Sequence, residues 1–127
     1  MYRTNVTRLA SRPGGRPIVK ESPELVAVTM RWVDAMSARD YDTAANLYHR
    51  SEHFRYIGSD VHEWWKGIAP IEAYAQHQSE LPEYEMEVLE VEAFETNSFG
   101  WAAARTRTTF GKYQPRDLRC TFVLSLI

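Results

Sequence analysis

The sequence contains one cysteine, Cys120, and lacks the long apolar runs of membrane-inserted and secreted proteins. A single cysteine excludes an intramolecular disulfide and a cysteine-rich zinc site. No apolar run approaches the roughly 18 residues that a membrane-spanning helix needs. No apolar segment near the N-terminus has the pattern of a secretory signal peptide. We therefore expect a cytoplasmic protein with no membrane partner, in which Cys120 is an unreactive core thiol.

Acidic residues are absent from the first 20 positions, which carry five basic ones, whereas the rest of the chain carries ten basic and seventeen acidic residues. An acidic body lacks the basic footprint of a nucleic-acid-binding protein, so we expect no nucleic-acid partner. Pro13 and Pro17 prevent a helix through the middle of the basic segment. We expect residues 1–21 to form a disordered leader, in preference to an organellar transit peptide, and residues 22–127 to form one domain.

Helical patterns occupy much of the first two thirds of the chain. A helix is predicted over residues 23–38, because Ser22 is a good N-cap and Pro23 suits the first helical position. Its apolar side chains recur at helical spacing, at Leu25, Val28, Trp32 and Met36. Two further helices are predicted within residues 39–50 and 68–81.

Strand patterns fill the remainder of the domain. The segment "HFRYIG" (53–58) is rich in aromatic and β-branched residues, and "WWKG" (64–67) has the pattern of a very short strand. The polar turn "SDVHE" joins them. Two longer strands are predicted over residues 100–110 and 117–127.

After Pro82 the hydrophobic period changes from 3.6 to 2 residues. Tyr84, Met86 and Val88 alternate with glutamates, and the alternation then resumes one residue out of phase at Leu89. Such a phase slip predicts a β-bulge, which bends a sheet. Helices grouped on one side of a bent, mainly antiparallel sheet make an α+β fold, and the enclosed cone is a natural pocket.

Three segments together carry a family resemblance: "RWVDAMSARDYDTAANLY", "FRYIGSDVHEWWKGIAPIEAY", and the bent strand over 83–96 with the two long strands after it. They resemble the nuclear transport factor two-like superfamily, and more narrowly its SnoaL-like, polyketide cyclase-like branch. The resemblance covers about residues 22–127. It implies a cone-shaped roll, in which about three helices of the N-terminal half pack on a strongly bent, mainly antiparallel sheet.

The end of the domain departs from the family pattern. Members of the superfamily normally close the sheet with one more strand after the equivalent of "CTFVLSLI". That final strand is missing from the pattern here. Because an apolar edge strand invites association, we expect a partner chain to cover it and the protein to be a homodimer.

The same cone serves isomerases, dehydratases, epoxide hydrolases, polyketide cyclases and non-catalytic modules, so the resemblance leaves the function open. We expect the domain to bind a small, mainly apolar molecule with side chains alone, without a metal or cofactor. If it is an enzyme, the resemblance implies proton-transfer chemistry of the isomerase, dehydratase or cyclase type. The alternative is a non-catalytic dimerisation or sensory module, such as those that precede nucleotide cyclase domains.

The stretch from His49 to His53 matches H-x-x-E-H, the signature of one class of zinc peptidases. That motif needs both histidines one turn apart on a continuous helix. Because a strand is predicted from Phe54 onwards, the helix should end near Arg50. We therefore expect no metal site, and we expect the two histidines to face solvent.

The polar turn and the strand before it hold the candidate catalytic residues. If the domain is an enzyme, it needs a base and a hydrogen-bond donor at the cone. We select Asp60 or His53 as the base and Tyr56 as the donor. The alternative is that Asp60 only shapes the turn while its neighbours His62 and Glu63 are solvated.

Aromatic residues are the candidates for the wall of an apolar ligand pocket. Trp64 and Trp65 are adjacent on a short strand, so one should enter the cone and the other should pack outside it. A competing explanation is that the aromatic rings only fill space in the core. The candidate ligand-binding residues are Trp32, Tyr48, Tyr56, Trp64, Trp65, Tyr84 and Trp101.

Arg105 and Arg107 lie two residues apart on one predicted strand and therefore share a face. If they faced inward, they would form an anion site. If they face outward, they pair with glutamates of the neighbouring strand. We favour the outward arrangement.

Overall fold

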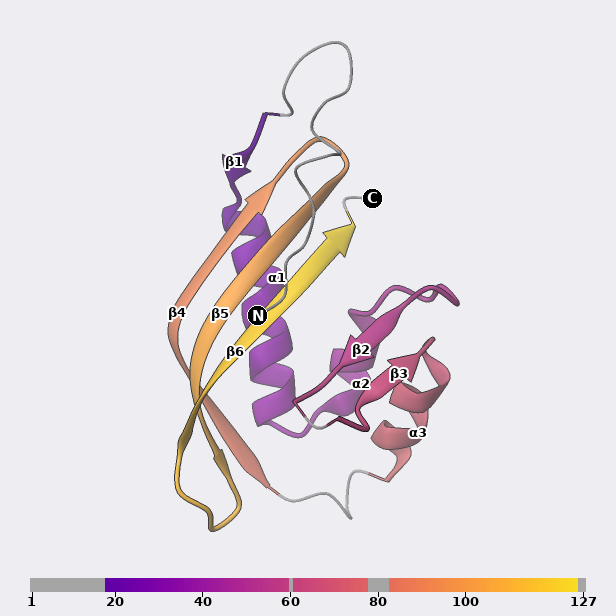
Figure 1. Ribbon diagram of the computed structural model, residues 1–127, viewed down its shortest axis with the longest axis vertical. Coiled ribbons are helices and arrows are strands. Elements are labelled where there is room, and N and C mark those ends of the chain that lie inside the picture. The colour runs from indigo at the N-terminus through magenta and orange to yellow at the C-terminus, as the bar shows by residue number, and fades with distance from the viewer. Residues whose placement is uncertain (1–17, 60, 78–82, 126–127) are drawn as a thin grey trace.

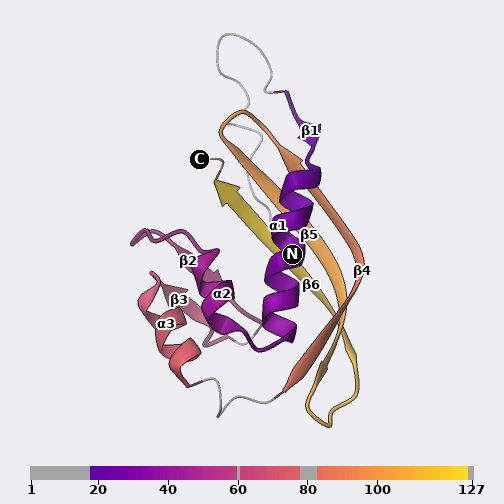
Figure 2. The same ribbon diagram turned by 180° about the vertical axis from the view of Figure 1, so that it is seen from behind.

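The computed structural model describes residues 18–59, 61–77 and 83–125. The helices are α1 (Pro23–Ser37), α2 (Tyr41–Asn46) and α3 (Ala69–Gln76). The strands are β1 (Lys20–Glu21), β2 (Arg55–Ile57), β3 (Trp64–Lys66), β4 (Tyr84–Glu95), β5 (Phe99–Phe110) and β6 (Arg116–Ser125). Figures 1 and 2 show α1 lying along the long strands, while α2, α3 and the β2–β3 hairpin group together beyond β6. This arrangement confirms the predicted α+β fold.

Helix α1 begins where the sequence predicted. The Ser22 hydroxyl accepts a hydrogen bond from the Leu25 N–H (3.2 Å), which is the capping role expected of it. Leu25, Trp32 and Val33 lie on the buried face and are 5%, 8% and 2% exposed. Burial of a side chain such as Leu25 or Val33 stabilises a fold by about 1.5–3 kcal/mol, so this face holds the helix on the sheet.

The main sheet has the order β1-β4-β5-β6, and all neighbouring strands are antiparallel. The register between β4 and β5 shifts between Val88 and Glu90, which leaves Leu89 as the extra residue. The predicted bulge is therefore confirmed at the predicted position. Before the bulge the even-numbered residues of β4 face inward, and after it the odd-numbered residues do.

Small side chains line the face of β5 that α1 covers. Ala102, Ala104 and Thr106 are at most 4% exposed. At Gly100 an added Cβ would collide with the Leu25 side chain. The close approach of helix and sheet therefore depends on the small size of these residues.

A two-residue strand lies at the end of the segment that was predicted to be a disordered leader. Residues 1–17 of the predicted leader lie outside the described residues, but Lys20 and Glu21 form β1 and pair with the end of β4. Glu95 on β4 holds this segment, since its carboxylate accepts a hydrogen bond from the Ser22 hydroxyl (2.7 Å) and lies 3.1 Å from Lys20 Nζ. These partners, the Ser22 hydroxyl first, lower the pKa of Glu95.

The other helices are shorter than the sequence pattern indicated. Helix α2 ends at Asn46, and α3 ends at Gln76, while residues 78–81 of the predicted third helix lie outside the described part. Strands β2 and β3 form a separate two-stranded sheet. None of the described helices is long and apolar enough to cross a membrane.

Candidate functional site

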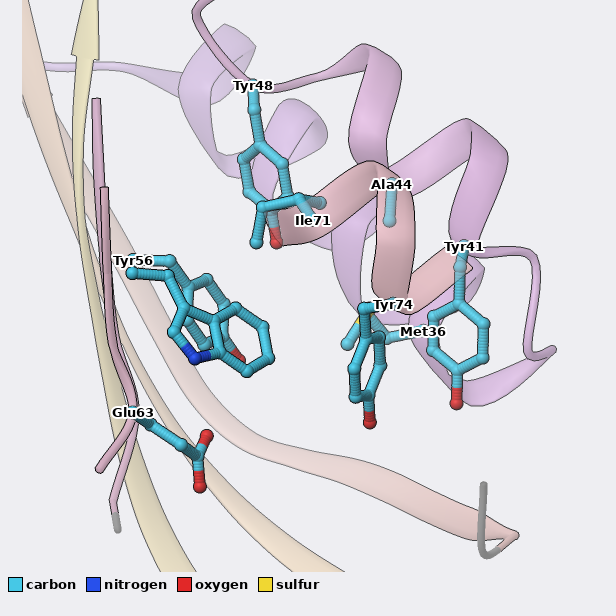
Figure 3. A pocket seen from close by; sticks show the side chains of 9 residues that line it. Met36, Tyr41, Ala44, Tyr48, Tyr56, Glu63, Ile71 and Tyr74 are labelled. Atoms are coloured by element: carbon cyan, nitrogen blue, oxygen red, sulfur yellow. The ribbon is translucent and has the colours of Figure 1, made fainter. Parts of the chain in front are cut away.

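A cavity of about 300 Å³ opens between the three helices and the β2–β3 hairpin. We call it the tyrosine pocket, and Figure 3 shows its side chains converging from these elements. Its lining residues are Met36, Tyr41, Ala44, Tyr48, Tyr56, Glu63, Trp65, Ile71 and Tyr74. Segments far apart in the sequence therefore supply one mainly aromatic wall.

The aromatic rings of the pocket form a continuous chain of contacts. Tyr41 meets Tyr74 edge to face (5.4 Å between ring centroids), and Tyr74 contacts Trp65 (5.5 Å). Trp65 stacks on Tyr56 (5.2 Å), and Tyr56 contacts Tyr48 (6.3 Å). Such offset and edge-to-face pairs each contribute about 0.5–1.5 kcal/mol beyond burial, so the rings stabilise one another along the wall.

The hairpin explains why Trp65 rather than its neighbour enters the pocket. Tyr56 and Trp65 are directly opposed on β2 and β3, so their side chains share a face. Trp64 is paired with Ile57 on the other face and is 56% exposed. The prediction that the two tryptophans point in opposite directions is confirmed.

Two of the pocket's phenols keep their protons at neutral pH. Burial is the main cause that raises the pKa of Tyr48 to about 12, and burial together with Tyr48 and Glu63 raises the pKa of Tyr56 further still. The Tyr48 oxygen accepts a hydrogen bond from Trp32 Nε1 (2.6 Å). Both tyrosines are therefore hydrogen-bond donors, not bases.

Glu63 is the single carboxylate among the described residues that line the tyrosine pocket. Its backbone oxygen accepts the Gly58 N–H (2.8 Å) across the hairpin. A Cβ at Gly58 would overlap the Glu63 carboxylate, so only glycine permits this side-chain position. Figure 3 shows the carboxylate reaching toward the aromatic wall. The site thus places one carboxylate among phenolic hydroxyl groups.

The catalytic candidates chosen from the sequence fall in different places. Tyr56 lies in the pocket, and Asp60 lies outside the described residues. The His53 side chain is 82% exposed, and its Nε2 lies 3.4 Å from the Glu52 carboxylate. His53 lies in the surface turn before β2 and does not line the tyrosine pocket.

Some of the predicted ligand-binding residues line the tyrosine pocket and others lie outside it. Tyr48, Tyr56 and Trp65 line the pocket, while Trp64 lies outside it. Trp101 contacts Phe94 and Phe99 on the sheet face that turns away from α1. The side chain of Tyr84 lies outside the described part of the structure.

The last ligand-binding candidate, Trp32, lies outside the tyrosine pocket, and two residues that do line the pocket were not predicted from the sequence. Trp32 is buried against Phe122 (5.0 Å between ring centroids), and it lines a second, larger cleft. Tyr41 and Tyr74 also line the tyrosine pocket, but they were not selected from the sequence as ligand-binding candidates.

The paired arginines face away from the cone, as favoured. Arg105 Nε lies 3.6 Å from the Glu90 carboxylate, and Arg107 Nε lies 3.4 Å from Asp117. Both arginine side chains are about half exposed. They form surface ion pairs, which contribute little to stability, and they do not build an anion site.

The structure also locates the H-x-x-E-H match and Cys120. Helix α2 ends at Asn46, so His49 and His53 do not share a helix and the H-x-x-E-H match has no zinc-peptidase geometry. Cys120 lies half-buried on β6, and burial raises the pKa of its thiol. A raised pKa reduces the reactive thiolate, in agreement with the inert role expected.

The second cleft has a volume of about 510 Å³ and shares five lining residues with the tyrosine pocket: Met36, Tyr48, Tyr56, Glu63 and Tyr74. Its walls are residues 118–124 of β6 and residues 54–59 at β2. Four residues of α1 contribute to its floor: Val28, Thr29, Trp32 and Met36. We call it the β6–β2 cleft.

Comparisons with known proteins agree with this architecture. An NTF2-like protein from Pseudomonas putida is 16% identical and has a TM-score of 0.62, with 82% of this chain and 78% of that chain covered. A proposed calcium/calmodulin-dependent protein kinase type II association domain from Thiobacillus denitrificans is 19% identical (TM-score 0.62; 80% and 81% covered). A proposed dehydratase of the NTF2-like family from Streptomyces avermitilis is 11% identical (TM-score 0.59; 79% and 82% covered).

At these identities the solved structures establish a shared fold and no shared activity. No curated protein matched the sequence. The sequence profile of the SnoaL-like domain matches residues 25–127, which is nearly the whole domain. The chain therefore belongs to the SnoaL-like domain family and has the NTF2-like fold.

Proposed function

We propose that the domain binds a small, flat, mainly apolar molecule in the tyrosine pocket and transfers a proton within it. One observation carries the proposal: the Glu63 carboxylate and the protonated phenol of Tyr56 line the same aromatic cavity. A volume of about 300 Å³ lies at the lower end of the range for ligand pockets. The stacked Tyr56 and Trp65 rings favour a planar ligand.

The chemistry follows from the positions of the two groups. Glu63 removes a proton from a carbon next to a carbonyl of the ligand. Tyr56 donates a hydrogen bond to the carbonyl oxygen, where negative charge develops, because its high pKa keeps it protonated. Return of the proton from Glu63 to another carbon completes an isomerisation. Transfer of that proton from Glu63 to a neighbouring hydroxyl group, which leaves as water, completes a dehydration. The step uses side chains alone.

The test is deuterium uptake by an enolisable aromatic ketone, β-tetralone, followed by NMR in heavy water. We expect the wild-type domain to accelerate uptake and the Glu63→Gln variant to lose about 100-fold of the acceleration. Glu24→Gln, at an exposed position in the first turn of α1, is the matched control and should keep the wild-type rate. Equal rates for Glu63→Gln and wild type would refute Glu63 as the base.

A second variant tests the placement of the carboxylate without removing it. In Gly58→Ala the new methyl group occupies the space of the Glu63 carboxylate and forces it to move. We expect proton transfer to fall by at least about tenfold, because catalysis depends on placement within about 1 Å. Binding of the ketone, followed by tryptophan fluorescence, should persist in both variants.

A non-catalytic association module is the second candidate. The similar fold of an association domain supports it, as does the aromatic cluster of Phe94, Phe99 and Trp101 on the outer sheet face. Phe99 is 41% exposed and could pack against a second copy. Ketone binding without proton exchange, together with a dimer in solution, would favour this function over the enzyme.

A further inference from the structure

The two sides of the tyrosine pocket present different polar groups. On the hairpin side lie the Glu63 carboxylate and the Tyr56 phenol, to which the proposed function assigns the reacting carbonyl. On the helix side lie the phenols of Tyr41, from α2, and Tyr74, from α3. Figure 3 shows these two hydroxyls pointing in the same direction, while the Glu63 carboxylate approaches from the hairpin. The helix-side phenols have no role in the proton transfer.

The Tyr41 hydroxyl is an exception to the rule that buried polar groups are hydrogen-bonded. Tyr41 is 3% exposed, and its hydroxyl has no hydrogen-bond partner in the described structure. A phenylalanine would make the same edge-to-face contact with Tyr74 without leaving a hydroxyl unsatisfied. Such an exception needs a physical explanation, and beside a cavity a bound ligand supplies one. The Tyr41 hydroxyl is therefore a candidate ligand contact.

Hydrogen bonds that do not involve this hydroxyl fix the position of Tyr41. The Asp40 carboxylate caps α2, since it accepts hydrogen bonds from the Thr43 N–H (3.2 Å) and the Thr43 hydroxyl (2.6 Å). The Asp40 N–H donates to the Ala35 carbonyl oxygen of α1 (2.8 Å). Tyr41 follows directly as the first residue of α2. A binding group that is held in place in advance loses little conformational entropy when a ligand binds.

Tyr74 supplies a second hydroxyl on the same side. Its ring lies 5.4 Å from the Tyr41 ring and 5.5 Å from the Trp65 ring, measured between centroids. Burial is the main cause that raises the pKa of Tyr74, and Tyr41 and Glu63 raise it further. Tyr74 is therefore a protonated phenol at neutral pH and can donate a hydrogen bond. Two neighbouring helices thus present O–H groups on one side of the pocket.

The rest of the lining restricts the charge of the ligand. No lysine, arginine or histidine is among the described residues that line the pocket. An anionic group on the helix side would lose its water without gaining a cation, which is unfavourable. The acceptor is therefore neutral, such as an ether, hydroxyl or carbonyl oxygen. Met36, Ala44 and Ile71 add apolar surface to the same cavity, so the body of the ligand is hydrocarbon.

We propose that the ligand carries an oxygen at each end: the reacting carbonyl beside Glu63 and Tyr56, and a neutral acceptor that binds the Tyr41 and Tyr74 hydroxyls. The ligand class is a flat, uncharged ketone with an oxygen substituent at the end remote from its carbonyl. Tyr41 and Tyr74 determine specificity and do not transfer the proton. This inference rests on the proposed function, because that function places the carbonyl on the hairpin side.

The test compares two ketones of nearly the same shape. In 6-methoxy-β-tetralone an ether oxygen lies remote from the carbonyl, and in 6-ethyl-β-tetralone a methylene replaces that oxygen. Isothermal titration calorimetry with the full chain measures both affinities. Tyr41→Phe and Tyr74→Phe should each weaken binding of the methoxy ketone by about fivefold relative to the ethyl ketone, as expected for one lost hydrogen bond. Tyr113→Phe, at a residue that is 75% exposed, is the matched control and should keep the wild-type ratio.

A charged ketone tests the requirement for a neutral acceptor. At neutral pH, 6-carboxy-β-tetralone should bind at least about tenfold more weakly than the methoxy ketone, because its carboxylate is desolvated without a cation. Equal or tighter binding of the carboxylate would overturn the proposal.

Stability separates a ligand contact from a structural role. Tyr41→Phe should keep or raise the midpoint of urea unfolding while it loses affinity for the methoxy ketone, a combination that loss of packing does not produce. An unchanged affinity ratio in either tyrosine variant would overturn the proposal.

Glu63→Gln separates this inference from the proposed proton transfer. The variant should keep the wild-type ratio of the two affinities, because that ratio measures binding on the helix side. Equal deuterium uptake by Glu63→Gln and wild type would overturn the proton transfer alone, and unchanged ratios in the tyrosine variants would overturn this inference alone. Failure of all three ketones to bind would overturn both.

Discussion

Two tyrosines of the pocket, the buried Tyr41 and the partly buried Tyr48, should respond in opposite ways to loss of the hydroxyl group. The Tyr48 oxygen accepts the Trp32 Nε1 hydrogen bond at 2.6 Å, and Trp32 is 8% exposed. The Tyr41 hydroxyl is buried and has no hydrogen-bond partner in the described structure. The Tyr48 hydroxyl therefore stabilises the fold. The Tyr41 hydroxyl has given up its hydrogen bonds to water on folding and has gained none within the protein.

The expected magnitudes follow from this difference. Tyr48→Phe leaves the Trp32 N–H unsatisfied, which should lower the free energy of unfolding by about 1–3 kcal/mol. Tyr41→Phe removes a hydroxyl that already lacks a partner, so the free energy of unfolding should stay unchanged or rise by up to about 1 kcal/mol. Tyr113→Phe, at a residue that is 75% exposed, should change it by less than about 0.5 kcal/mol.

Urea unfolding followed by far-UV circular dichroism measures all three variants on one scale. The order of stability should be Tyr41→Phe at or above wild type, Tyr113→Phe near wild type, and Tyr48→Phe clearly below. If Tyr41→Phe costs as much as Tyr48→Phe, the two hydroxyls are equivalent and the reasoning from the hydrogen-bond partners is refuted.

The same Tyr48 hydroxyl predicts how stability depends on alkaline pH. Its pKa is raised from the ordinary value of 10.0 to about 12 in the folded protein. A raised folded pKa gives stability that is complete below the unfolded pKa and is lost as pH rises through the folded pKa. Tyr48 alone should therefore contribute a loss of about 2–3 kcal/mol of stability between about pH 10 and pH 12, and Tyr48→Phe should remove that contribution.

Three further predictions concern other parts of the fold. Gly100→Ala should lower the free energy of unfolding by about 1–3 kcal/mol in urea titrations, because its Cβ would collide with Leu25; an unchanged midpoint would contradict the tight packing. Ser22→Ala removes a helix cap and a partner of Glu95, so in urea titrations it should cost about 1 kcal/mol at neutral pH and should weaken the loss of stability as pH falls through the lowered Glu95 pKa. A variant as stable as wild type at both pH values would contradict both roles of Ser22. The protein should be a dimer by light scattering, and Trp101→Glu should make it monomeric; a monomeric wild type at working concentrations would exclude the outer sheet face as an interface.

Much of the fold was predictable because local patterns and packing agree. The N-cap at Ser22 and the phase slip at Leu89 are both confirmed, since a helix terminus and a bulge depend on neighbouring residues. The outward direction of Arg105 follows from strand alternation and the acidic neighbour strand. The start of β1 at Lys20 was missed, because it depends on a contact with Glu95, which is distant in sequence.

The candidate site was less predictable for a physical reason. A polar turn with several ionisable residues does not reveal which side chain turns inward, so the sequence favoured Asp60 and His53. The structure directs Glu63 into the pocket because Gly58 has no side chain to obstruct it. Tyr41 and Tyr74 come together only when α2 packs on α3.

The sequence by itself determined most of the helices and strands, the bend of the sheet and the family resemblance, because hydrophobic period, capping residues and a phase slip act over a few positions. Tertiary structure alone decided which carboxylate meets the tyrosines and which residues line the β6–β2 cleft. Those outcomes depend on contacts between residues far apart in the chain, such as Trp32 with Phe122, and their geometry exists only once the helices have packed on the sheet.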